Sequence, residues 1–382
     1  MADALAPSTF EEAAEALAQA ARQGHAIRIV GGATKLAWGA VPPADPAVEL
    51  RTAALGLIVE HNVGDLTAVL EAGVPLARAQ DTFASRGQML ALDPPLGASS
   101  ERDATIGGIV ATGDCGPLCH RYGAPRDLVV GITVALSDGT IARSGGKVIK
   151  NVAGYDVAKL FAGSFGTLGM ILSVNVRLHP LPAATATAVG ASADPERLAV
   201  AARTLAGAPL ELDALDVAWQ AGAGRILARA GGAQAGRRAE RVARLMADAG
   251  LEQVQAETDD EELWERQRAG QRSATGALVR VAARPSALAA VVRAAQACDG
   301  TLVGRAALGS SFIALDPPAV SRLRQLLPPG APSVLLDAPA ELRGQLEPWG
   351  AAEQQTLELM RRVKLRFDPA RVCNPGVFVG GI

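Results

Sequence analysis

The sequence predicts an α+β fold in two domains, and three observations support this prediction. The 382 residues exceed what one ordinary hydrophobic core organises. Apolar residues make up 49% of the chain and charged residues 20%, which is a globular composition. Strand and helix patterns interleave, and near residue 180 glycine-rich segments give way to an alanine-rich stretch. We therefore predict a first domain over residues 1–180 and a smaller α+β domain over 181–360.

The N-terminal segment is predicted to be a surface helix rather than a signal peptide. Ser8 or Thr9 would cap the helix, and Glu11 and Glu12 would occupy its first turn. A signal peptide instead begins with positive charges followed by an apolar run, and this segment has neither.

The first domain continues with predicted strands separated by turn signals. Gly73–Pro75 is predicted to separate a strand from the helix that follows it, and Ser137–Gly139 is typical of a hairpin turn. The uncharged run 160–176 predicts a buried turn and strand. The predicted segments are a strand at 26–32, a strand, turn, strand and helix at 55–87, a hairpin at 127–145 and a long strand at 166–182.

The second domain is predicted to be an antiparallel sheet with helices, because the connections between its segments are short. Residues 232–250 form a charged amphipathic pattern typical of a surface helix. The Pro- and Ala-rich region 316–350 is expected to be flexible or to face a partner. The predicted strands lie near 209–219, 225–230, 276–283 and 311–315.

Charge and composition exclude several classes of partner and location. The chain has 37 Lys and Arg against 39 Asp and Glu, and only 3% aromatic residues, so we expect no nucleic-acid partner. Four cysteines in so long a chain indicate no disulfide scaffold and favour the cytoplasm. The uncharged run 160–176 falls short of the ~20 residues of a spanning helix. No membrane span is predicted, and peripheral association with the inner face of the membrane is left open.

Familiar phosphate, dinucleotide and nucleophile motifs fail when they are tested. In the glycine-rich segment 141–148, Lys147 is followed by Val148 where a P-loop needs Ser or Thr. Cys115, Cys119 and His120 lack a fourth ligand and the closer spacing of zinc or iron–sulfur sites. We therefore predict no metal site and interpret the thiols as small residues of a tight glycine-rich loop.

Three glycine-rich stretches remain as candidate binding elements. Glycines that follow the end of a strand let a ligand come close to the backbone, and a concave group of backbone N–H groups can hold a pyrophosphate. The candidate cofactor-binding residues of the first stretch are Gly31, Gly32, Ala33, Thr34, Lys35 and Leu36. Those of the second are Pro94, Gly97, Ala98, Thr105, Ile106, Gly107, Gly108, Ala111, Thr112 and Gly113. Those of the third are Lys150, Gly169 and Ile171.

The order of these stretches over about residues 25–180 resembles the FAD-binding domain of the vanillyl-alcohol oxidase / p-cresol methylhydroxylase (PCMH-type) family. The resemblance implies a two-part FAD-binding domain, with the first loop on the pyrophosphate and the strand after Gly166 beside the flavin. It also implies that the chain is a flavoprotein and an oxidoreductase. Residues 364–376 are similar to the closing segment of the family's 2-hydroxyacid and glycolate oxidase branch. The segment 361–382 is therefore expected to return to the FAD domain.

Within that branch, residues 145–171 look most like the FAD-binding subunits of bacterial glycolate oxidases. The resemblance implies two partners, a catalytic flavin subunit and an iron–sulfur subunit, with a small 2-hydroxyacid as the substrate of the complex. Covalent members of the family attach FAD through a histidine in the first loop. Because Ala33 and Thr34 stand there, we expect non-covalent FAD, with Cys115 as the remaining nearby candidate for a thioether.

The second domain lacks the residues on which catalytic relatives depend. Oxidising an alcohol by hydride transfer needs a base near the hydroxyl, and the relatives use a histidine-and-acid metal cluster. Here no histidine follows His179. Arginines that could meet a carboxylate are Arg225, Arg229, Arg280 and Arg305.

No catalytic residue is assigned, and three functions stay open. The first is a flavin subunit that supports oxidation of glycolate to glyoxylate and passes electrons to a partner, with Lys147 and Lys150 near the cofactor. The second is a self-sufficient FAD-dependent 2-hydroxyacid dehydrogenase. The third is a non-catalytic assembly module with the same fold.

Overall fold

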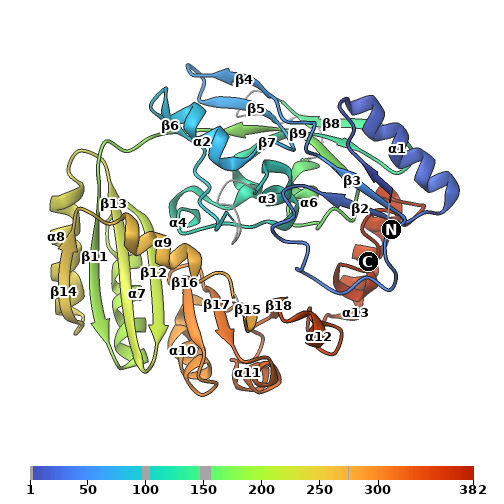
Figure 1. Ribbon diagram of the computed structural model, residues 1–382. Helices are drawn as coiled ribbons and strands as arrows, with labels where there is room; N and C mark the ends of the chain where they lie inside the picture. Colours follow the sequence, from blue (N-terminus) through green and yellow to red (C-terminus); the bar gives the residue numbers. More distant parts are fainter. Residues whose placement is uncertain (1–2, 97–103, 147–155, 274) are drawn as a thin grey trace. The chain divides into compact units, whose positions relative to one another are not determined.

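The computed structural model describes residues 3–96, 104–146, 156–273 and 275–382 (Figure 1). The chain divides into two compact units, each with its own sheet and core. Unit 1 comprises Met1–Cys115, Gly123–Leu181 and Ala351–Ile382, and unit 2 comprises Gly116–Tyr122 and Pro182–Gly350. Helices and strands mix in both units, so the predicted α+β class is confirmed. Across the described ranges, no helix has both the length and the apolar character needed to cross a membrane.

Unit 1 is built around a three-stranded sheet, a five-stranded sheet and a two-stranded ribbon. Their strand orders are β1-β3-β2, β4-β5-β9-β7-β8 and β10-β6. The strands are β1 (Asp3–Leu5), β2 (Ile27–Val30), β3 (Val48–Arg51), β4 (Ile58–Asn62), β5 (Thr67–Glu71), β6 (Gln88–Met89), β7 (Val129–Ala135), β8 (Ile141–Gly145), β9 (Met170–Arg177) and β10 (His179–Pro180). The helices are α1 (Phe10–Gln23), α2 (Leu76–Ala84), α3 (Ile106–Thr112), α5 (Pro125–Leu128), α6 (Ala158–Phe161) and α13 (Gln354–Phe367).

Helix α1 begins as the sequence predicts. The Thr9 hydroxyl accepts a hydrogen bond from the Glu12 backbone N–H at 3.1 Å, and the Glu12 carboxylate accepts one from the Thr9 N–H at 3.3 Å. This reciprocal capping box satisfies two backbone donors that the helix itself leaves without partners. The buried face of α1 includes Leu17 and packs with Leu50 and Leu172 in one core cluster.

The second part of the uncharged run 160–176 forms β9 at the centre of the five-stranded sheet, as predicted for a buried strand, whereas residues 160–161 belong to helix α6 and Leu160 is exposed. Strand β9 pairs antiparallel with β5 on one side and with β7 on the other. Met170, Leu172 and Val174 are fully buried. A strand that is buried on both faces needs a continuous apolar run, which is the pattern that also imitates a membrane segment.

The C-terminal segment is anchored in unit 1 by a buried ion pair at the end of α13. The Lys364 ammonium lies 2.6 Å from Asp368 Oδ2 and also donates to the carbonyl oxygens of Thr167 at 2.7 Å and Cys373 at 2.9 Å. Asp368 accepts from the backbone N–H groups of Val372 and Cys373. Burial raises the pKa of the Cys373 thiol, so this cysteine stays protonated and unreactive.

Unit 2 contains an eight-stranded sheet whose neighbouring strands pair antiparallel, in the order β14-β11-β13-β12-β16-β17-β15-β18. The strands are β11 (Thr185–Ser192), β12 (Leu212–Gln220), β13 (Ala223–Gly231), β14 (Glu252–Glu257), β15 (Ala277–Ala282), β16 (Thr301–Arg305), β17 (Ser310–Leu315) and β18 (Ser333–Asp337). The helices are α4 (Cys119–Tyr122), α7 (Pro195–Gly207), α8 (Ala235–Asp248), α9 (Glu261–Ala269), α10 (Leu288–Gln296), α11 (Val320–Leu326) and α12 (Ala340–Arg343).

The region 316–350 corrects one expectation from the sequence. It contains helix α11, strand β18 and helix α12, and β18 pairs with β15 at the end of the sheet. Leu323 and Leu335 are buried in the main core cluster of unit 2. The expectation of a flexible stretch is therefore wrong, because its scattered leucines supply core contacts that the Pro- and Ala-rich composition obscures.

Helix α9 packs on the sheet face opposite to the other long helices of unit 2. The main core cluster uses Leu215 and Ile226, whereas Trp264 of α9 packs against Ala214 and Leu227, their neighbours in the chain. Successive side chains of a strand point to opposite faces, so the two clusters lie on opposite faces of the sheet.

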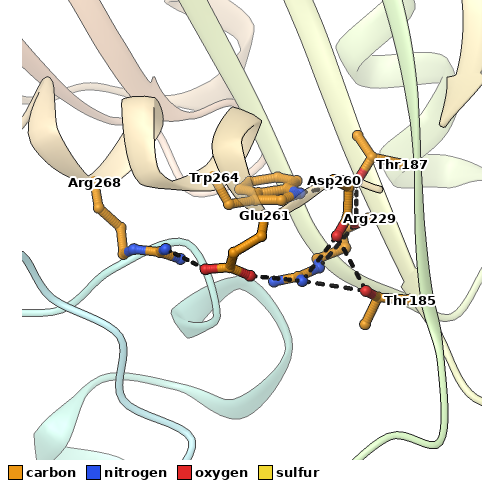
Figure 2. A network of polar contacts seen from close by, with 7 residues as sticks. All are labelled: Thr185, Thr187, Arg229, Asp260, Glu261, Trp264 and Arg268. Carbon is orange, nitrogen blue, oxygen red and sulfur yellow. Dashed lines mark hydrogen bonds and ion pairs between the residues drawn. The ribbon is translucent and has the colours of Figure 1, made fainter. Parts of the chain in front are cut away.

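A polar network holds α9 to strands β11 and β13 of this sheet (Figure 2). The Arg229 guanidinium donates to both carboxylate oxygens of Asp260, at 3.1 and 3.0 Å, and lies 5.8 Å from the Trp264 ring centre. The indole N–H of Trp264 donates to the Thr187 hydroxyl at 2.8 Å, and that hydroxyl donates to Asp260 at 2.7 Å. Glu261 bridges Arg229 and Arg268. Buried polar groups are tolerated here because each one has a partner.

The Thr187→Val variant is expected to lower the free energy of unfolding by about 1–3 kcal/mol. It removes the acceptor of the Trp264 N–H and a donor to Asp260 while keeping the side-chain shape, and a buried group without its partner costs its desolvation. Urea unfolding followed by circular dichroism measures the change. Thr301→Val, on an exposed strand position, is the control. An unchanged midpoint for Thr187→Val would show that the network contributes little.

Candidate cofactor-binding site

A cleft in unit 1 brings together segments from the beginning, middle and end of the chain. The space between its walls, counted out into open solvent, is about 1140 Å³. Its walls come from β2 and the loop that follows, from α3, from the turn that precedes β9, and from the C-terminal segment.

Thirteen of the predicted cofactor-binding residues line this cleft. They are Gly31, Gly32, Ala33, Thr34, Lys35, Leu36, Thr105, Gly107, Gly108, Ala111, Thr112, Gly169 and Ile171. Pro94, Ile106 and Gly113 are not part of the lining: Ile106 is buried in α3, and Gly113 ends that helix with a φ of 64°. Gly97, Ala98 and Lys150, together with Lys147, lie outside the described residues.

The cleft opens at the carboxyl ends of two parallel strands. Val30 and Arg51 are partners in the parallel pairing of β2 and β3, so the next residues, Gly31 and Thr52, lie side by side. Both line the cleft. The carboxyl edge of parallel strands is where chains commonly leave a sheet and form a crevice that can hold a ligand.

Helix α3 approaches this edge closely because glycine stands at the contacts. Thr105 caps the helix by accepting from the Gly108 N–H at 3.3 Å. A Cβ on Gly31 would lie 2.3 Å from the Thr105 hydroxyl oxygen, and one on Gly107 would lie 2.7 Å from the Ala72 Cβ. A side chain at Gly31 would separate the strand edge from the helix, and one at Gly107 would push the helix away from Ala72, which follows β5.

Asn374 connects the C-terminal segment to two other walls of the cleft. Its side-chain oxygen accepts from the Ile29 N–H at 2.8 Å, and its amide nitrogen donates to the Phe165 carbonyl at 2.6 Å. Ala33, Phe165 and Asn374 line the cleft with φ values of 59°, 56° and 42°, a region that costs a non-glycine residue roughly 1 kcal/mol. Such backbone strain concentrates at binding sites, where surrounding contacts hold it.

The ionisable side chains of the described lining are two cations. Lys35 lies 3.3 Å from Asp114 Oδ2 in a nearly buried pair, and Arg28 lies 3.8 Å from Glu49. The positive charge of Lys35 is therefore present at the cleft, but it forms an ion pair with Asp114. Together with exposed glycine backbone, this lining suits an anionic dinucleotide such as FAD, and the residues present fit that cofactor.

Sequence reasoning missed several lining residues. Thr52 follows an ordinary strand and Arg28 lies within one, so neither is part of a recognisable motif. Asn374 was part of the closing segment that pointed to the family, but its position gave no sign that it would reach β2. Only the backbone pairing of residue 374 with Ile27 brings it there.

Unit 2 places the candidate arginines in different environments. Arg229 is paired with Asp260, and Arg305 lies 2.5 Å from Asp216, both of this pair being almost fully buried. Arg280 stacks 5.8 Å from the Phe312 ring centre, and Arg225 is exposed. Two of the four therefore already bind carboxylates of the chain itself.

The segment around the two neighbouring cysteines also belongs mainly to unit 2. Cys119 and His120 lie in the short helix α4, where Arg121 contacts Asp213 at 3.0 Å. Burial lowers the pKa of His120, so it is neutral at pH 7. Among the described residues, no group of three or more His, Cys, Asp or Glu side chains is arranged to hold a metal ion, and all four cysteines are free thiols.

Two family models match separate parts of the chain. Residues 3–145 match the FAD binding domain, and residues 349–378 match the C-terminal domain of FAD linked oxidases. These matches show a flavoprotein with FAD as its cofactor. Both models describe FAD-dependent oxidoreductases, and the first agrees with the PCMH-type FAD-binding domain that the glycine-rich stretches predicted.

Curated relatives match part of the chain. Glycolate oxidase subunit GlcE of Escherichia coli is 38% identical over 34% of this chain and 36% of its own length. Glycolate oxidase subunit GlcD of Bacillus subtilis is 37% identical over 41% of this chain and 33% of its own. D-lactate dehydrogenase of Archaeoglobus fulgidus is 35% identical over 46% and 38%. The matched segments thus span little more than a third of these relatives.

A solved structure of alkyldihydroxyacetonephosphate synthase matches over almost the whole chain. The match covers 97% of this chain and 76% of the synthase chain, with a TM-score of 0.70 and 13% sequence identity. At this identity the likeness concerns the fold, and it extends to both units.

Proposed function

We propose that this chain is the FAD-binding subunit of a multi-subunit oxidase that converts a small 2-hydroxyacid, glycolate in the first instance, to its 2-oxoacid. The observation that carries the proposal is the cleft of unit 1, in a chain of which 34% is 38% identical to glycolate oxidase subunit GlcE. A catalytic flavin subunit and an iron–sulfur subunit would be its partners. The cytoplasmic location inferred from cysteine usage stays a prediction.

The chain's own residues would hold the cofactor rather than transform the substrate. The loop after β2 would receive the pyrophosphate on exposed backbone, and Arg28 would supply positive charge. Asn374 would keep the C-terminal segment and the turn at Phe165 in place around the cofactor. When bound, FAD supplies the capacity to accept and release electrons. Because Ala33 and Thr34 replace a histidine in the loop, the cofactor would be held without a covalent bond.

The pairing of arginines in unit 2 supports a subunit role. A self-sufficient dehydrogenase would use a cation for the substrate carboxylate, yet Arg229 and Arg305 are engaged with Asp260 and Asp216. The match to an archaeal D-lactate dehydrogenase favours the alternative of a self-sufficient FAD-dependent 2-hydroxyacid dehydrogenase. The two proposals differ in what the isolated chain can do.

The test compares the isolated chain with the assembled complex. The purified chain is expected to show the blue and near-ultraviolet absorption of bound flavin, and acid precipitation is expected to release that flavin into solution. With glycolate or D-lactate and a dye acceptor, we expect turnover only after the catalytic flavin and iron–sulfur subunits are added. Rapid bleaching of the isolated chain would support the self-sufficient enzyme. A folded, colourless protein that takes up no FAD would support an assembly module.

A further inference from the structure

The hydroxyl of Thr52 is an unexplained polar group in the wall of the cleft. Thr52 is 4% exposed, and its Oγ1 is buried without a hydrogen-bond partner among the described residues. The residue nevertheless lines the cleft. A buried hydroxyl without a partner costs free energy, so native proteins seldom keep one without a ligand or a water beside it.

Both backbone hydrogen-bonding groups of Thr52 have partners, which fixes the position of the side chain. Its N–H donates to the Val30 carbonyl at 2.9 Å, and its carbonyl accepts from the Leu55 N–H at 2.9 Å. Gly73 packs directly on that carbonyl, since a Cβ there would lie 2.0 Å from the oxygen. The hydroxyl is therefore the remaining hydrogen-bonding group of the residue, and it is held on a rigid support.

The position of Thr52 indicates the chemistry of what it would bind. It follows β3 as Gly31 follows the parallel strand β2, so the two residues form neighbouring parts of one edge. The Gly31–Gly32 loop offers backbone N–H groups, and the cations Arg28 and Lys35, paired with Glu49 and Asp114, belong to the same lining. Donors and cations gathered at one edge favour an anionic oxygen, and a threonine hydroxyl can donate to one.

We propose that Thr52 binds a phosphate oxygen of FAD through its hydroxyl, so that both parallel strands contribute to the pyrophosphate site. The inference rests on the proposed use of this cleft for FAD and adds a residue that no glycine motif includes. A hydrogen bond to a charged acceptor is stronger than one between neutral groups, so its loss has a measurable effect on affinity.

Thr52→Val and Thr52→Ser test the proposal in the full-length chain freed of flavin. Valine keeps the shape and removes the hydroxyl, whereas serine keeps the hydroxyl. We expect Thr52→Val to raise the Kd for FAD about 10-fold or more. We expect the same factor for ADP, which carries the pyrophosphate without the flavin, and a Kd close to that of the unmodified chain for Thr52→Ser. Binding is measured by titration calorimetry.

The melting temperature of the cofactor-free protein separates a ligand contact from a structural role. It should be unchanged or higher in Thr52→Val, since no protein partner is lost. A Kd for FAD within 2-fold of the original would overturn the proposal, as would equal losses in the serine and valine variants, or a lower melting temperature in Thr52→Val. ADP affinity that stays unchanged while FAD affinity falls would also overturn it. If the original chain binds no FAD, the cofactor assignment of the cleft fails instead.

Discussion

Replacing Asp368 with alanine is expected to lower the free energy of unfolding of unit 1 by about 3–5 kcal/mol. The substitution leaves the Lys364 ammonium buried beside two carbonyl oxygens without its counter-charge, and removing one member of a buried ion pair costs this much. It also deprives the Val372 and Cys373 N–H groups of their acceptor. Urea unfolding of the cofactor-free protein measures the loss.

The matched control is an exposed ion pair in the same unit. Glu15 and Arg22 lie 2.7 Å apart on α1 with 69% and 62% of their side chains exposed, so Glu15→Ala should change stability by less than about 1 kcal/mol. A second variant, Asp368→Asn, keeps an acceptor oxygen and should lose less than Asp368→Ala. If Asp368→Ala unfolds at the same urea concentration as Glu15→Ala, the buried pair does not anchor the C-terminal segment.

The Gly31→Ala variant is expected to weaken FAD binding about 10- to 100-fold. Its new Cβ would lie 2.3 Å from the Thr105 hydroxyl oxygen, which caps α3, so either the helix or the strand edge must move. Overpacking of this kind costs about 1–3 kcal/mol, and the displaced segments are the two walls of the cleft. Fluorescence titration of the flavin-free protein gives the affinity.

Gly64→Ala is the control for this effect. Gly64 lies in the turn between β4 and β5, where an added Cβ would have its nearest neighbour at 3.7 Å. This variant should bind FAD as the unmodified chain does. Equal affinity for Gly31→Ala would mean that α3 adjusts freely and that the close packing at this glycine is not needed for binding.

Local patterns in the sequence predicted local structure well. The Thr9 and Glu12 pair marked the start of α1, and the turn at Ser137–Gly139 joins β7 and β8 as expected, because the determining contacts lie within a few residues. The glycine-rich stretches located nearly half of the cleft lining for a similar reason. A glycine needed for close approach leaves a trace in composition even when its neighbour is far away in the chain.

Contacts between distant segments left no such trace. Nothing near Asn374 shows that its side chain will meet Ile29, and nothing near Thr52 shows that its hydroxyl will be enclosed in a cleft. The alanine-rich stretch at 185–192 forms β11, because its burial between β13 and β14 outweighs the weak strand propensity of alanine. The assignment of Gly116–Tyr122 to unit 2 was equally invisible, since its contacts, such as that of Arg121 with Asp213, span about 90 residues.

The return of the C-terminal segment to unit 1 has a consequence for biosynthesis. Asn374 completes the cleft by bonding to Ile29, a partner 345 positions earlier in the chain. On the ribosome, β2 and the glycine loop emerge early, but the cleft is completed only after Pro182–Gly350 has been translated. At a translation rate of about 5–20 residues per second, the C-terminal segment that completes the cleft is made tens of seconds after the early segments. Unit 2 can fold during that interval, so the cofactor would be captured as a late step in the maturation of the nascent chain.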